Sequence, residues 1–442
     1  MRHYIKIHNL TVKGIPGSAL SMEIAKGEVV AITGACGSGK TTLVSCIAGI
    51  RRPEKIGMVL VDGLDPFSQL DERKIHRLCG IVQQDPDDDI VFDSVIRDIA
   101  FAPENIGLEK QRISKRALTY FKSLELIGKQ KRRYDELSLG EKQRACIAGV
   151  LIMHHDILVM DDAFSMMDDE KAVKLLKSII SSARKKGQTV IYTSSKYDEL
   201  ALADRIIQLK QGTATVKQLD DIENVAPKGA SPVEDTIPGA EFGIRALGPD
   251  GTPIYDDLTE DSVLAVFRDI HFNYGRERII AGISGALGRG RMYRITGPAS
   301  SGKSTFLKLL AGLIKPTAGS IDTYGKLVCG LQLPSSQLFD DSVIEDVMYQ
   351  KRASGVSRAD ARLEAEMILT KLGVPKKLWE RHPLTLSMGE QRLVVLAGVF
   401  AADADIILLD KPFTGLDSEG YYKVRMFIDE LLRERKCVVV VE

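Results

Sequence analysis

The sequence predicts an α/β protein made of two copies of one domain, each built around a mostly parallel sheet. Apolar runs typical of strands, such as VVAIT and ILVM, alternate with amphipathic stretches such as EKAVKLLKSIISSARKK. Three short motifs occur twice in the same order, and a glycine-rich loop follows an apolar run in each copy. Alternating strands and helices favour a parallel sheet covered by helices.

The internal repeat gives the predicted domain boundaries. Segments 27–50, 138–150 and 156–168 recur as 290–313, 387–399 and 405–417. We therefore expect domain one over 1–212 and domain two over 263–442. The stretch 213–262 is dense in Pro, Gly and Asp and lacks any regular apolar period, which predicts an irregular linker.

Composition limits the possible functions. Of the 442 residues, 44% are apolar and 27% are charged, and 60 basic residues balance 60 acidic ones. Net charge therefore gives no reason to expect a nucleic-acid partner. We find no apolar run of about 18 residues that would span a bilayer and no signal peptide, and the cysteines lack metal or disulfide spacing. We expect a cytosolic protein.

Each copy contains G-x-x-x-x-G-K-[ST], the phosphate-binding P-loop, between an apolar strand and a helix. Backbone N–H groups of such a loop bind phosphate, and the helix that follows adds its positive end. Lys40 and Lys303 should reach the β- and γ-phosphates of ATP. Thr41 and Ser304 should ligate Mg²⁺. A structural turn is the alternative for one loop alone. The predicted nucleotide contacts are Gly34, Gly37, Ser38, Gly39, Lys40, Thr41 and Thr42 in domain one, and Gly297, Ser300, Ser301, Gly302, Lys303, Ser304 and Thr305 in domain two.

Two further apolar runs, ILVMDD and IILLD, end in acidic residues. Asp161 and Asp410 are predicted to hold Mg²⁺, as strand-terminal aspartates do in P-loop proteins. A turn aspartate is the alternative for either residue alone. The presence of a P-loop upstream in each copy favours the metal-binding interpretation.

Both copies resemble ABC-type ATPases. LSLGE (137–141) and LSMGE (386–390) are similar to the LSGGQ signature of that family and lie, as there, between the P-loop and the acidic strand. Gln84 and Gln332 match its Q-loop glutamine, and SMMD (165–168) and TGLD (414–417) resemble its D-loops. The resemblance implies two nucleotide-binding domains, each a mostly parallel sheet core with a helical subdomain that contains the signature.

The resemblance also implies two ATP sites in an intramolecular dimer. In the family, two domains close head to tail, so that each ATP lies between one P-loop and the other domain's signature. Both Q-loop glutamines would contact Mg²⁺. The residues assigned in this way, besides the P-loops, are Gln84, Asp161, Ser387 and Gly389 at site one, and Gln332, Asp410, Ser138 and Gly140 at site two.

Two catalytic positions depart from the family pattern. The family's water-positioning glutamate is replaced by Asp162 and Lys411. An aspartate carboxylate falls about 1.5 Å short, and misplacement by about 1 Å can cost about 10²-fold, so site one should be slow. Lys411 cannot accept a proton, and loss of a general base costs about 10²–10⁴-fold. We expect site two to hold ATP with little turnover. The alternative is that Lys411 turns into solvent.

Two other positions are also asymmetric. The family's switch histidine is replaced by Ser195, which can hydrogen-bond but carries no charge. Domain two stops at Glu442, one residue before its own switch position, so we expect it to be incomplete at the C-terminal end. Tyr274 matches the family's adenine-stacking aromatic, whereas domain one has Gly14 there. Ordinary strand packing is the alternative role for Tyr274.

The stretches after the two Q-loops, QDPDDDIVFDSVIRDIAFAPENIGL and LPSSQLFDDSVIEDVMY, resemble those of energy-coupling-factor (ECF) transporter ATPases. There the region receives a helix from a membrane subunit, although plain amphipathic surface helices are the alternative. We expect a slow, asymmetric ATPase at the cytoplasmic face of the cell membrane, with separate transmembrane and substrate-binding subunits and no nucleic acid. The alternatives are a soluble ABC ATPase acting on ribosomes or nucleic acid, and an ATP-gated interaction module with little hydrolysis.

Overall fold

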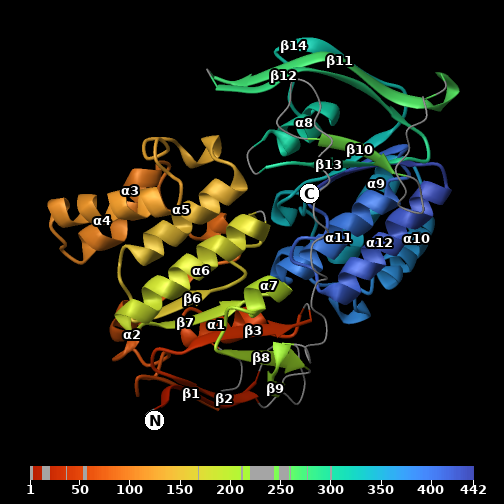
Figure 1. Ribbon diagram of the computed structural model, residues 1–442. Helices are drawn as coiled ribbons and strands as arrows, with labels where there is room; N and C mark the ends of the chain where they lie inside the picture. The colour runs from red at the N-terminus through yellow and green to blue at the C-terminus, as the bar shows by residue number, and fades with distance from the viewer. Residues whose placement is uncertain are drawn as a thin grey trace. The chain divides into compact units, whose positions relative to one another are not determined.

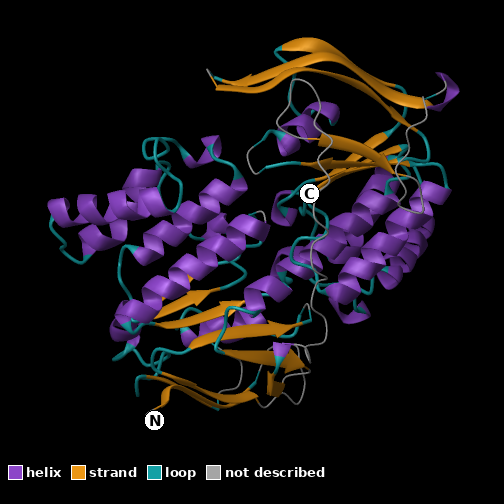
Figure 2. Cartoon of the chain, viewed as in Figure 1, coloured by secondary structure: helices purple, strands orange, loops and turns teal. Residues whose placement is uncertain are grey.

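The chain divides into two compact units, residues 1–229 and 230–442. The computed structural model describes residues 3–11, 20–35, 37–52, 57–167, 169–210, 213–219, 243–247, 258, 260–275, 277–298 and 301–442. Within those ranges no helix has both the length and the apolar character needed to cross a membrane. Each unit combines a mostly parallel sheet, a small antiparallel sheet and covering helices, which confirms the predicted fold class (Figures 1 and 2).

The larger sheet of unit one has the strand order β5-β6-β7-β3-β8-β9, and only β8 and β9 run antiparallel. Strands β6 and β7 are buried along their whole length, as expected for parallel strands covered on both faces. The six strands are β3 (Val29–Gly34), β5 (Cys79–Val82), β6 (Ile157–Met160), β7 (Thr189–Thr193), β8 (Arg205–Lys210) and β9 (Thr213–Lys217). A second, antiparallel sheet consists of β1 (His3–Leu10), β2 (Leu20–Ala25) and β4 (Met58–Val61).

The large sheet of unit one separates two hydrophobic cores. Alternate residues of β3 face opposite sides, as strand geometry requires: Val29 and Ala31 pack with the helical side, and Val30 and Ile32 pack with α1 and the antiparallel sheet. The helices of this unit are α1 (Lys40–Ile47), α2 (Glu72–Leu78), α3 (Val95–Asn105), α4 (Lys110–Ser123), α5 (Leu139–Leu151), α6 (Asp169–Lys186) and α7 (Tyr197–Leu200).

Unit two repeats this plan. Its larger sheet has the order β10-β13-β17-β16-β15, with only β10 antiparallel to its neighbour. The strands are β10 (Gly243–Leu247), β13 (Met292–Thr296), β15 (Leu327–Gly330), β16 (Ile406–Asp410) and β17 (Cys437–Val441), and the antiparallel sheet consists of β11 (Val263–Tyr274), β12 (Glu277–Gly288) and β14 (Ala318–Thr323). Its helices are α8 (Lys303–Leu310), α9 (Val343–Ala353), α10 (Arg358–Lys371), α11 (Met388–Ala401) and α12 (Ser418–Arg433).

Each unit contains a group of three helices that includes its signature motif. In unit one α3, α4 and α5 pack against one another, and in unit two α9, α10 and α11 do the same. The apolar faces of these helices join the core on one side of the parallel sheet. The signature therefore lies at the start of a helix, α5 or α11, that is fixed by packing on both sides.

The prediction of an irregular linker over 213–262 was wrong for part of that stretch. Strand β9 extends the sheet of unit one by pairing with β8, and β10 extends the sheet of unit two by pairing with β13. Both are antiparallel strands at the edge of a sheet, each hydrogen-bonded to a single neighbouring strand. Such a strand can be partly open to solvent, so its sequence needs little apolar pattern. Most of the remaining linker residues lie outside the described ranges.

The predicted motifs of unit one meet at one edge of its sheet. The P-loop follows β3, the Q-loop follows β5, Asp161 follows β6, and Ser195 lies just beyond β7. Carboxyl ends of parallel strands share an edge, and ligands of open α/β sheets bind there. Parallel pairing therefore brings together segments more than a hundred residues apart in sequence.

We predict that Leu369→Ala destabilises unit two by about 2–5 kcal/mol, because a buried leucine would leave a cavity. Leu369 is fully buried in the core that also contains Trp379, the one tryptophan of the chain. Urea unfolding followed by Trp379 fluorescence measures the change. Leu363 is 71% exposed on the same helix, so Leu363→Ala is a matched control expected within about 0.5 kcal/mol of wild type. Equal losses in both variants would contradict the packing of α10.

Candidate active site

The P-loop of unit one is held against the neighbouring strand. Gly34 has φ +150°, and a Cβ on it would lie 2.4 Å from the carbonyl oxygen of Leu209, so only glycine fits. The Nζ atom of Lys40, the first residue of α1, donates to the carbonyl oxygens of Gly34 at 2.6 Å and Ala35 at 3.0 Å. The lysine side chain thus lies inside the curve of the loop.

The P-loop of unit two has the same construction. Lys303 Nζ donates to the carbonyl oxygens of Gly297 and Pro298, both at 2.7 Å. Gly302, with φ +94°, precedes α8, and a Cβ there would meet Ile279 of β12 at 2.8 Å. Ser300, a predicted contact, lies outside the described residues.

Both loops fit an anionic ligand. The hydroxyl groups of Ser38 and Ser301 are buried and have no hydrogen-bond partner among the described residues. A buried polar group without a partner is costly, so a phosphate oxygen is a suitable acceptor for each. Neither α1 nor α8 has an acidic residue in its first turn, which leaves the positive end of each helix available to an anion.

In unit one the strand-terminal carboxylate is held by two hydroxyl groups. Asp161 is 3% exposed, Thr193 Oγ1 of β7 donates to its Oδ1 at 2.7 Å, and Thr41 also hydrogen-bonds to it. Burial raises the pKa of Asp161, while the threonines and Lys40 oppose that shift. Thr193 also accepts a bond from the N–H of Asp162 at 2.7 Å. The sequence analysis missed Thr193, whose partners lie more than 30 residues away in the chain.

The predicted water-positioning carboxylate contacts the Q-loop. Gln84 Nε2 donates to Asp162 Oδ2 at 3.0 Å. Asp162 has a left-handed backbone with φ +46°. Burial raises the pKa of Asp162 to about 7, and the nearby Glu199 adds to the shift. The structure thus brings two predicted catalytic residues, Gln84 and Asp162, into direct contact.

The segment after β7 contains a charged group that the sequence analysis did not assign. Ser195 is half-buried, and its neighbour Lys196 forms ion pairs with Asp169 at 2.8 Å and Glu199 at 3.6 Å. Burial alone would lower the pKa of Lys196, but these two carboxylates raise it overall. Ser194 Oγ donates to Glu199 Oε2 at 2.7 Å and fixes that carboxylate. A cation therefore lies directly after Ser195, the residue predicted to stand at the switch-histidine position.

In unit two the strand-terminal carboxylate has different neighbours. Asp410 is 2% exposed and hydrogen-bonds to Ser304, but within the part of the chain that the structure describes its Oδ1 has no hydrogen-bond partner. The residue opposite Asp410 on β17 is Val441, whose side chain has no hydroxyl group. In unit one the corresponding aspartate, Asp161, receives a hydrogen bond from the hydroxyl group of Thr193 on β7. Burial raises the pKa of Asp410, and Lys411 and the buried guanidinium of Arg392 oppose that shift.

The Q-loops are anchored by the signature helices. In unit one Gln143 of α5, fully buried, donates from Nε2 to the carbonyl oxygen of Gln83 at 3.1 Å. In unit two Arg392 of α11 donates to the carbonyl oxygens of Leu331, at 2.9 Å, and Gln332. Gln332 itself is buried. Sequence analysis missed both anchors, although the aligned motifs place Gln143 and Arg392 at the same position.

Each signature serine is the N-cap of its helix. Ser138 accepts from the N–H of Glu141 at 3.4 Å, and Glu141 accepts from the N–H of Ser138 at 2.9 Å. Ser387 and Glu390 form the same capping box at 3.4 and 2.9 Å. The pattern S-x-x-E predicts this arrangement directly. Gly140 and Gly389 lie in the first turn, at the positive end of each helix.

Tyr274 lies at the end of β11, in the hairpin whose second strand contacts the P-loop glycine Gly302. Its side chain is 50% exposed and meets Phe272 edge to face at 4.8 Å between ring centroids. An exposed ring that is held in place by one aromatic neighbour can stack on a planar ligand. The counterpart in unit one, Gly14, lies outside the described residues.

The donor set of unit one fits Mg²⁺. Thr41 and Asp161 supply a hydroxyl group and a carboxylate that are hydrogen-bonded to each other. Gln84 bonds to Asp162, the residue that follows Asp161 in the chain. Mg²⁺ takes one or two protein oxygens together with phosphate and water. Within the described ranges no group of three or more His, Cys, Asp or Glu side chains is placed to bind a metal ion, so those residues form no metal site made of such side chains alone.

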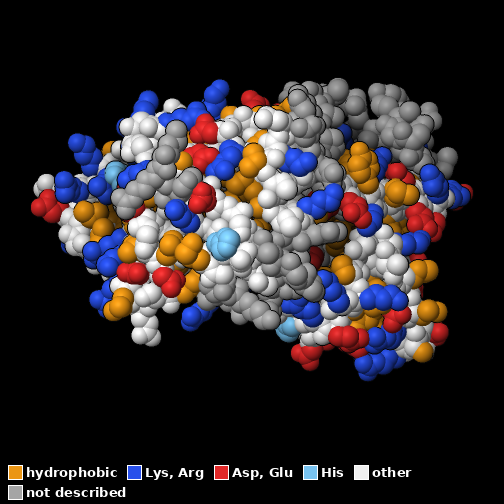
Figure 3. Space-filling model, turned by 90° about the horizontal axis from the view of Figure 1, so that it is seen from below, with side chains coloured by type: hydrophobic (Ala, Val, Ile, Leu, Met, Phe, Trp, Pro, Cys, Tyr) orange, Lys and Arg blue, Asp and Glu red, His pale blue; other side chains and the backbone are white. Residues whose placement is uncertain are grey.

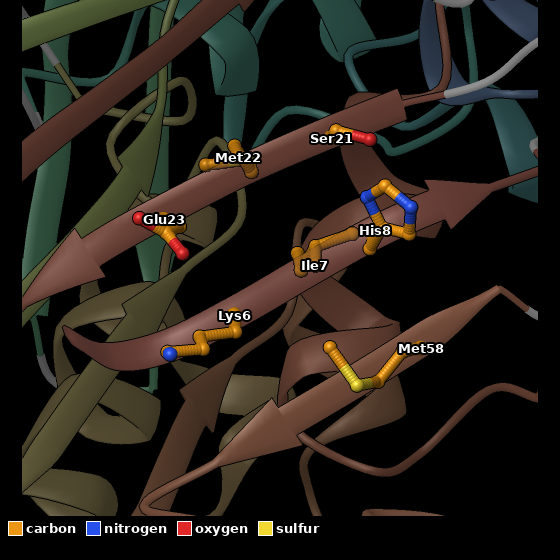
Figure 4. Close-up of a pocket in the computed structure, with 7 residues that line it drawn as sticks. All are labelled: Lys6, Ile7, His8, Ser21, Met22, Glu23 and Met58. Atoms are coloured by element: carbon orange, nitrogen blue, oxygen red, sulfur yellow. The ribbon is translucent and has the colours of Figure 1, made fainter.

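A hollow on the surface of unit one lies away from the predicted site. A cavity of about 390 Å³ lies on the antiparallel sheet of unit one, lined by Lys6, Ile7, His8, Ser21, Met22, Glu23 and Met58 (Figure 4). It contains no residue of the predicted site. On the face shown in Figure 3, basic and acidic side chains are interspersed.

A family model described as ABC transporter matches residues 18–165 and 280–414. The chain belongs to this family. Both matches cover a P-loop, a signature helix and a strand-terminal aspartate, so the ABC motifs occur twice in one chain. Membership confirms the predicted enzyme class, an ATP-hydrolysing ABC enzyme.

Relatives of this ABC protein have names of the same kind. A protein of Bifidobacterium longum named provisionally as an ABC transporter ATP-binding protein is 29% identical over 94% of this chain and 59% of its own length. This chain thus spans less than two thirds of that relative. A similarly named protein of Treponema denticola is 29% identical over 96% of this chain and 87% of its own. The archaeal ribosome recycling factor aABCE1 matches with a TM-score of 0.59 at 22% identity, over 98% of this chain and 84% of that chain, which shows a shared fold.

We predict that the stability of unit one falls as Asp162 ionises. Its pKa is raised from the ordinary aspartate value of 3.8 to about 7 in the fold, so the stabilisation is present below about pH 4 and is lost as the pH rises through about 7. Asp162→Asn cannot ionise. Without nucleotide and in EDTA, its melting temperature should therefore gain about 3–6 °C on wild type between about pH 5 and about pH 8.

The exposed Glu170 supplies the control, since Glu170→Gln should follow the wild-type curve. An unchanged difference between Asp162→Asn and wild type across this pH range would show that Asp162 is not the titrating group.

Proposed function

We propose that this chain is the ATP-binding and slowly hydrolysing subunit of an ECF-type membrane importer, whose membrane-spanning and substrate-binding components are separate proteins. The observation that supports this proposal is an aromatic pair in the segment after each Q-loop, with one ring exposed in unit one and both rings exposed in unit two. In unit one Phe92 and Phe101 meet edge to face at 5.1 Å, and in unit two Phe339 and Tyr349 meet at 4.7 Å. Exposed apolar patches of this kind mark interaction sites.

In each unit an aspartate fixes the backbone at one ring of the aromatic pair. Asp98 accepts from the N–H groups of Val91 at 2.8 Å and Phe92 at 2.9 Å. Asp346 does the same for Phe339 and Asp340, both at 3.3 Å. The loops that present the rings therefore have a fixed backbone, which lowers the entropy cost of binding.

The surface of unit two includes a cavity. A hollow of about 70 Å³ lies between α9, α11 and β15, and its lining includes Phe339, Tyr349, Val394 and Val395. Phe339 is 63% exposed and Tyr349 is 45% exposed. An apolar helix of a membrane subunit would bury both rings and fill this hollow, as amphipathic helices do in apolar grooves. The names of the relatives, ABC transporter ATP-binding proteins, support the same proposal.

The proposed chemistry differs between the two sites. At site one Asp162 positions the attacking water, Gln84 links that carboxylate to the Q-loop, and Lys40 binds the phosphates. Bound Mg²⁺ would neutralise phosphate charge between Thr41 and Asp161. Ser387 and Gly389 would complete this site from the other domain, and Ser138 and Gly140 would complete site two. Site two holds ATP, with Tyr274 against the adenine.

The two alternatives remain distinct proposals. The fold is shared with a ribosome recycling factor, so a soluble ATPase acting on ribosomes is one of them. The replacement of the catalytic carboxylate by Lys411 favours the other, an ATP-gated interaction module with little hydrolysis.

We expect a tagged chain to recover a membrane protein from detergent-solubilised membranes of the source cells, in a manner that depends on ATP and Mg²⁺. Phe339→Asp combined with Tyr349→Asp should reduce that recovery at least about tenfold, because each change places a charge in an apolar contact. Leu363→Asp is the matched control, since Leu363 is 71% exposed in the same helical group but distant in sequence from the Q-loop. Recovery of ribosomes or of soluble proteins alone would replace the importer proposal with one of the alternatives.

We expect Lys40→Ala to lower ATP turnover by at least about tenfold, because it removes the cation of the site that hydrolyses. Lys411→Glu should raise turnover by restoring a carboxylate at site two. Steady-state phosphate release, measured with the membrane partner present, checks both. Unchanged turnover in Lys40→Ala would refute the assignment of hydrolysis to site one.

A further inference from the structure

The charge around the two strand-terminal aspartates differs between the units. In unit one the groups that act electrostatically on Asp161 and Asp162 include one further carboxylate and three cations, Glu199, Lys40, Lys196 and Arg51. In unit two the charged groups that act most strongly on Asp410 are three cations, Lys411, Arg392 and Lys308. The leading electrostatic influences on Asp410 therefore all come from cations, whereas those on Asp161 and Asp162 come from carboxylates as well as cations.

Lys411 occupies the same backbone conformation as its counterpart Asp162. Both residues follow the strand-terminal aspartate directly, and both are left-handed, with φ +49° and φ +46°. The N–H of Lys411 donates to the carbonyl oxygen of Val441 at 3.0 Å, which fixes the main chain. The two side chains thus leave the same point of the fold with opposite charge.

Arg392 adds a second positive charge that cannot move away. Its side chain is 1% exposed, and its two hydrogen bonds to the carbonyl oxygens of Leu331 and Gln332 hold the guanidinium under the Q-loop. The same anchoring in unit one uses the neutral amide of Gln143. Anchoring therefore does not require a charge, and the charge in unit two is an additional feature.

We propose that domain two binds ATP without requiring Mg²⁺, with Lys411 and Arg392 supplying the positive charge that a divalent cation supplies elsewhere. This inference rests on the proposed function, in which domain two holds ATP. Fixed cations near the phosphates attract them and repel a divalent cation at the same place. The bound nucleotide would then be metal-free ATP at domain two and Mg²⁺–ATP at domain one.

The test uses the full chain with Lys40→Ala, so that nucleotide binding reports mainly domain two, and an ATP analogue with a fluorescent ribose label. We expect the Kd in EDTA to lie within about threefold of the Kd in excess Mg²⁺. Adding Lys411→Glu should weaken binding in EDTA by at least about tenfold and make it Mg²⁺-dependent. Lys411→Met, which is neutral and similar in size, should give an intermediate loss in EDTA.

The matched control is Lys423→Glu, the same substitution at a lysine of α12 that pairs with the exposed Glu419. It should keep Mg²⁺-independent binding, and Trp379 fluorescence shows that each variant is folded. Lys303→Ala should abolish the metal-free signal and so assign it to domain two. Binding only in Mg²⁺ would overturn this inference and leave ATP binding intact. No binding with or without Mg²⁺ would instead refute ATP binding by domain two.

Discussion

A carboxylate buried at the end of a parallel strand needs nearby hydrogen-bond donors or cations to replace its lost hydration. Both units are organised around that requirement. Removal of an ionised carboxylate from water costs several kcal/mol unless hydrogen bonds or charges replace its hydration. Asp161 receives hydroxyl groups from Thr193 and Thr41, and two cations, Lys40 and Arg51, also act on it. Asp410 has one hydroxyl partner, Ser304, and three cations act on it. The main chain is the same, but hydroxyl groups contribute more at Asp161 and cations contribute more at Asp410.

That difference has separate consequences for stability and for chemistry. Hydroxyl groups leave the Asp161 carboxylate able to bind a metal, since they donate one bond each and add no repulsion. Cations compensate the charge more fully, yet they oppose a divalent ion. Each unit therefore satisfies the folding requirement, and under the proposals above the choice of partner would decide what each site binds.

The sequence alone could predict the parts of this fold that depend on local pattern. The P-loops, the buried strands β6 and β16 and the long helix α6 follow from short motifs and periodicity. The roles of Thr193, Lys196 and Arg392 could not be predicted in this way. Each acts on a group that another strand or helix brings close, and Arg392 lies 60 residues from the Q-loop carbonyl it binds. Strands β9 and β10 were missed because an edge strand needs little apolar pattern.

The capping boxes are an intermediate case. S-x-x-E at each signature is a local pattern that predicts a helix N-terminus at Ser138 and Ser387, and the structure has α5 and α11 beginning there. What the pattern cannot predict is the ligand that this N-terminus faces, because that depends on how the domains pair.

The signature helix of unit two links its three predicted functional surfaces within a few turns. Ser387 caps the helix, Arg392 holds the Q-loop from below, and Val394 and Val395 line the hollow beside Phe339. An α-helix is stiff over this length, since its residues are tied by successive backbone bonds. A shift of α11 would therefore move the Q-loop and the aromatic surface of unit two together. In unit one, α5 makes the corresponding connection through Ser138 and Gln143.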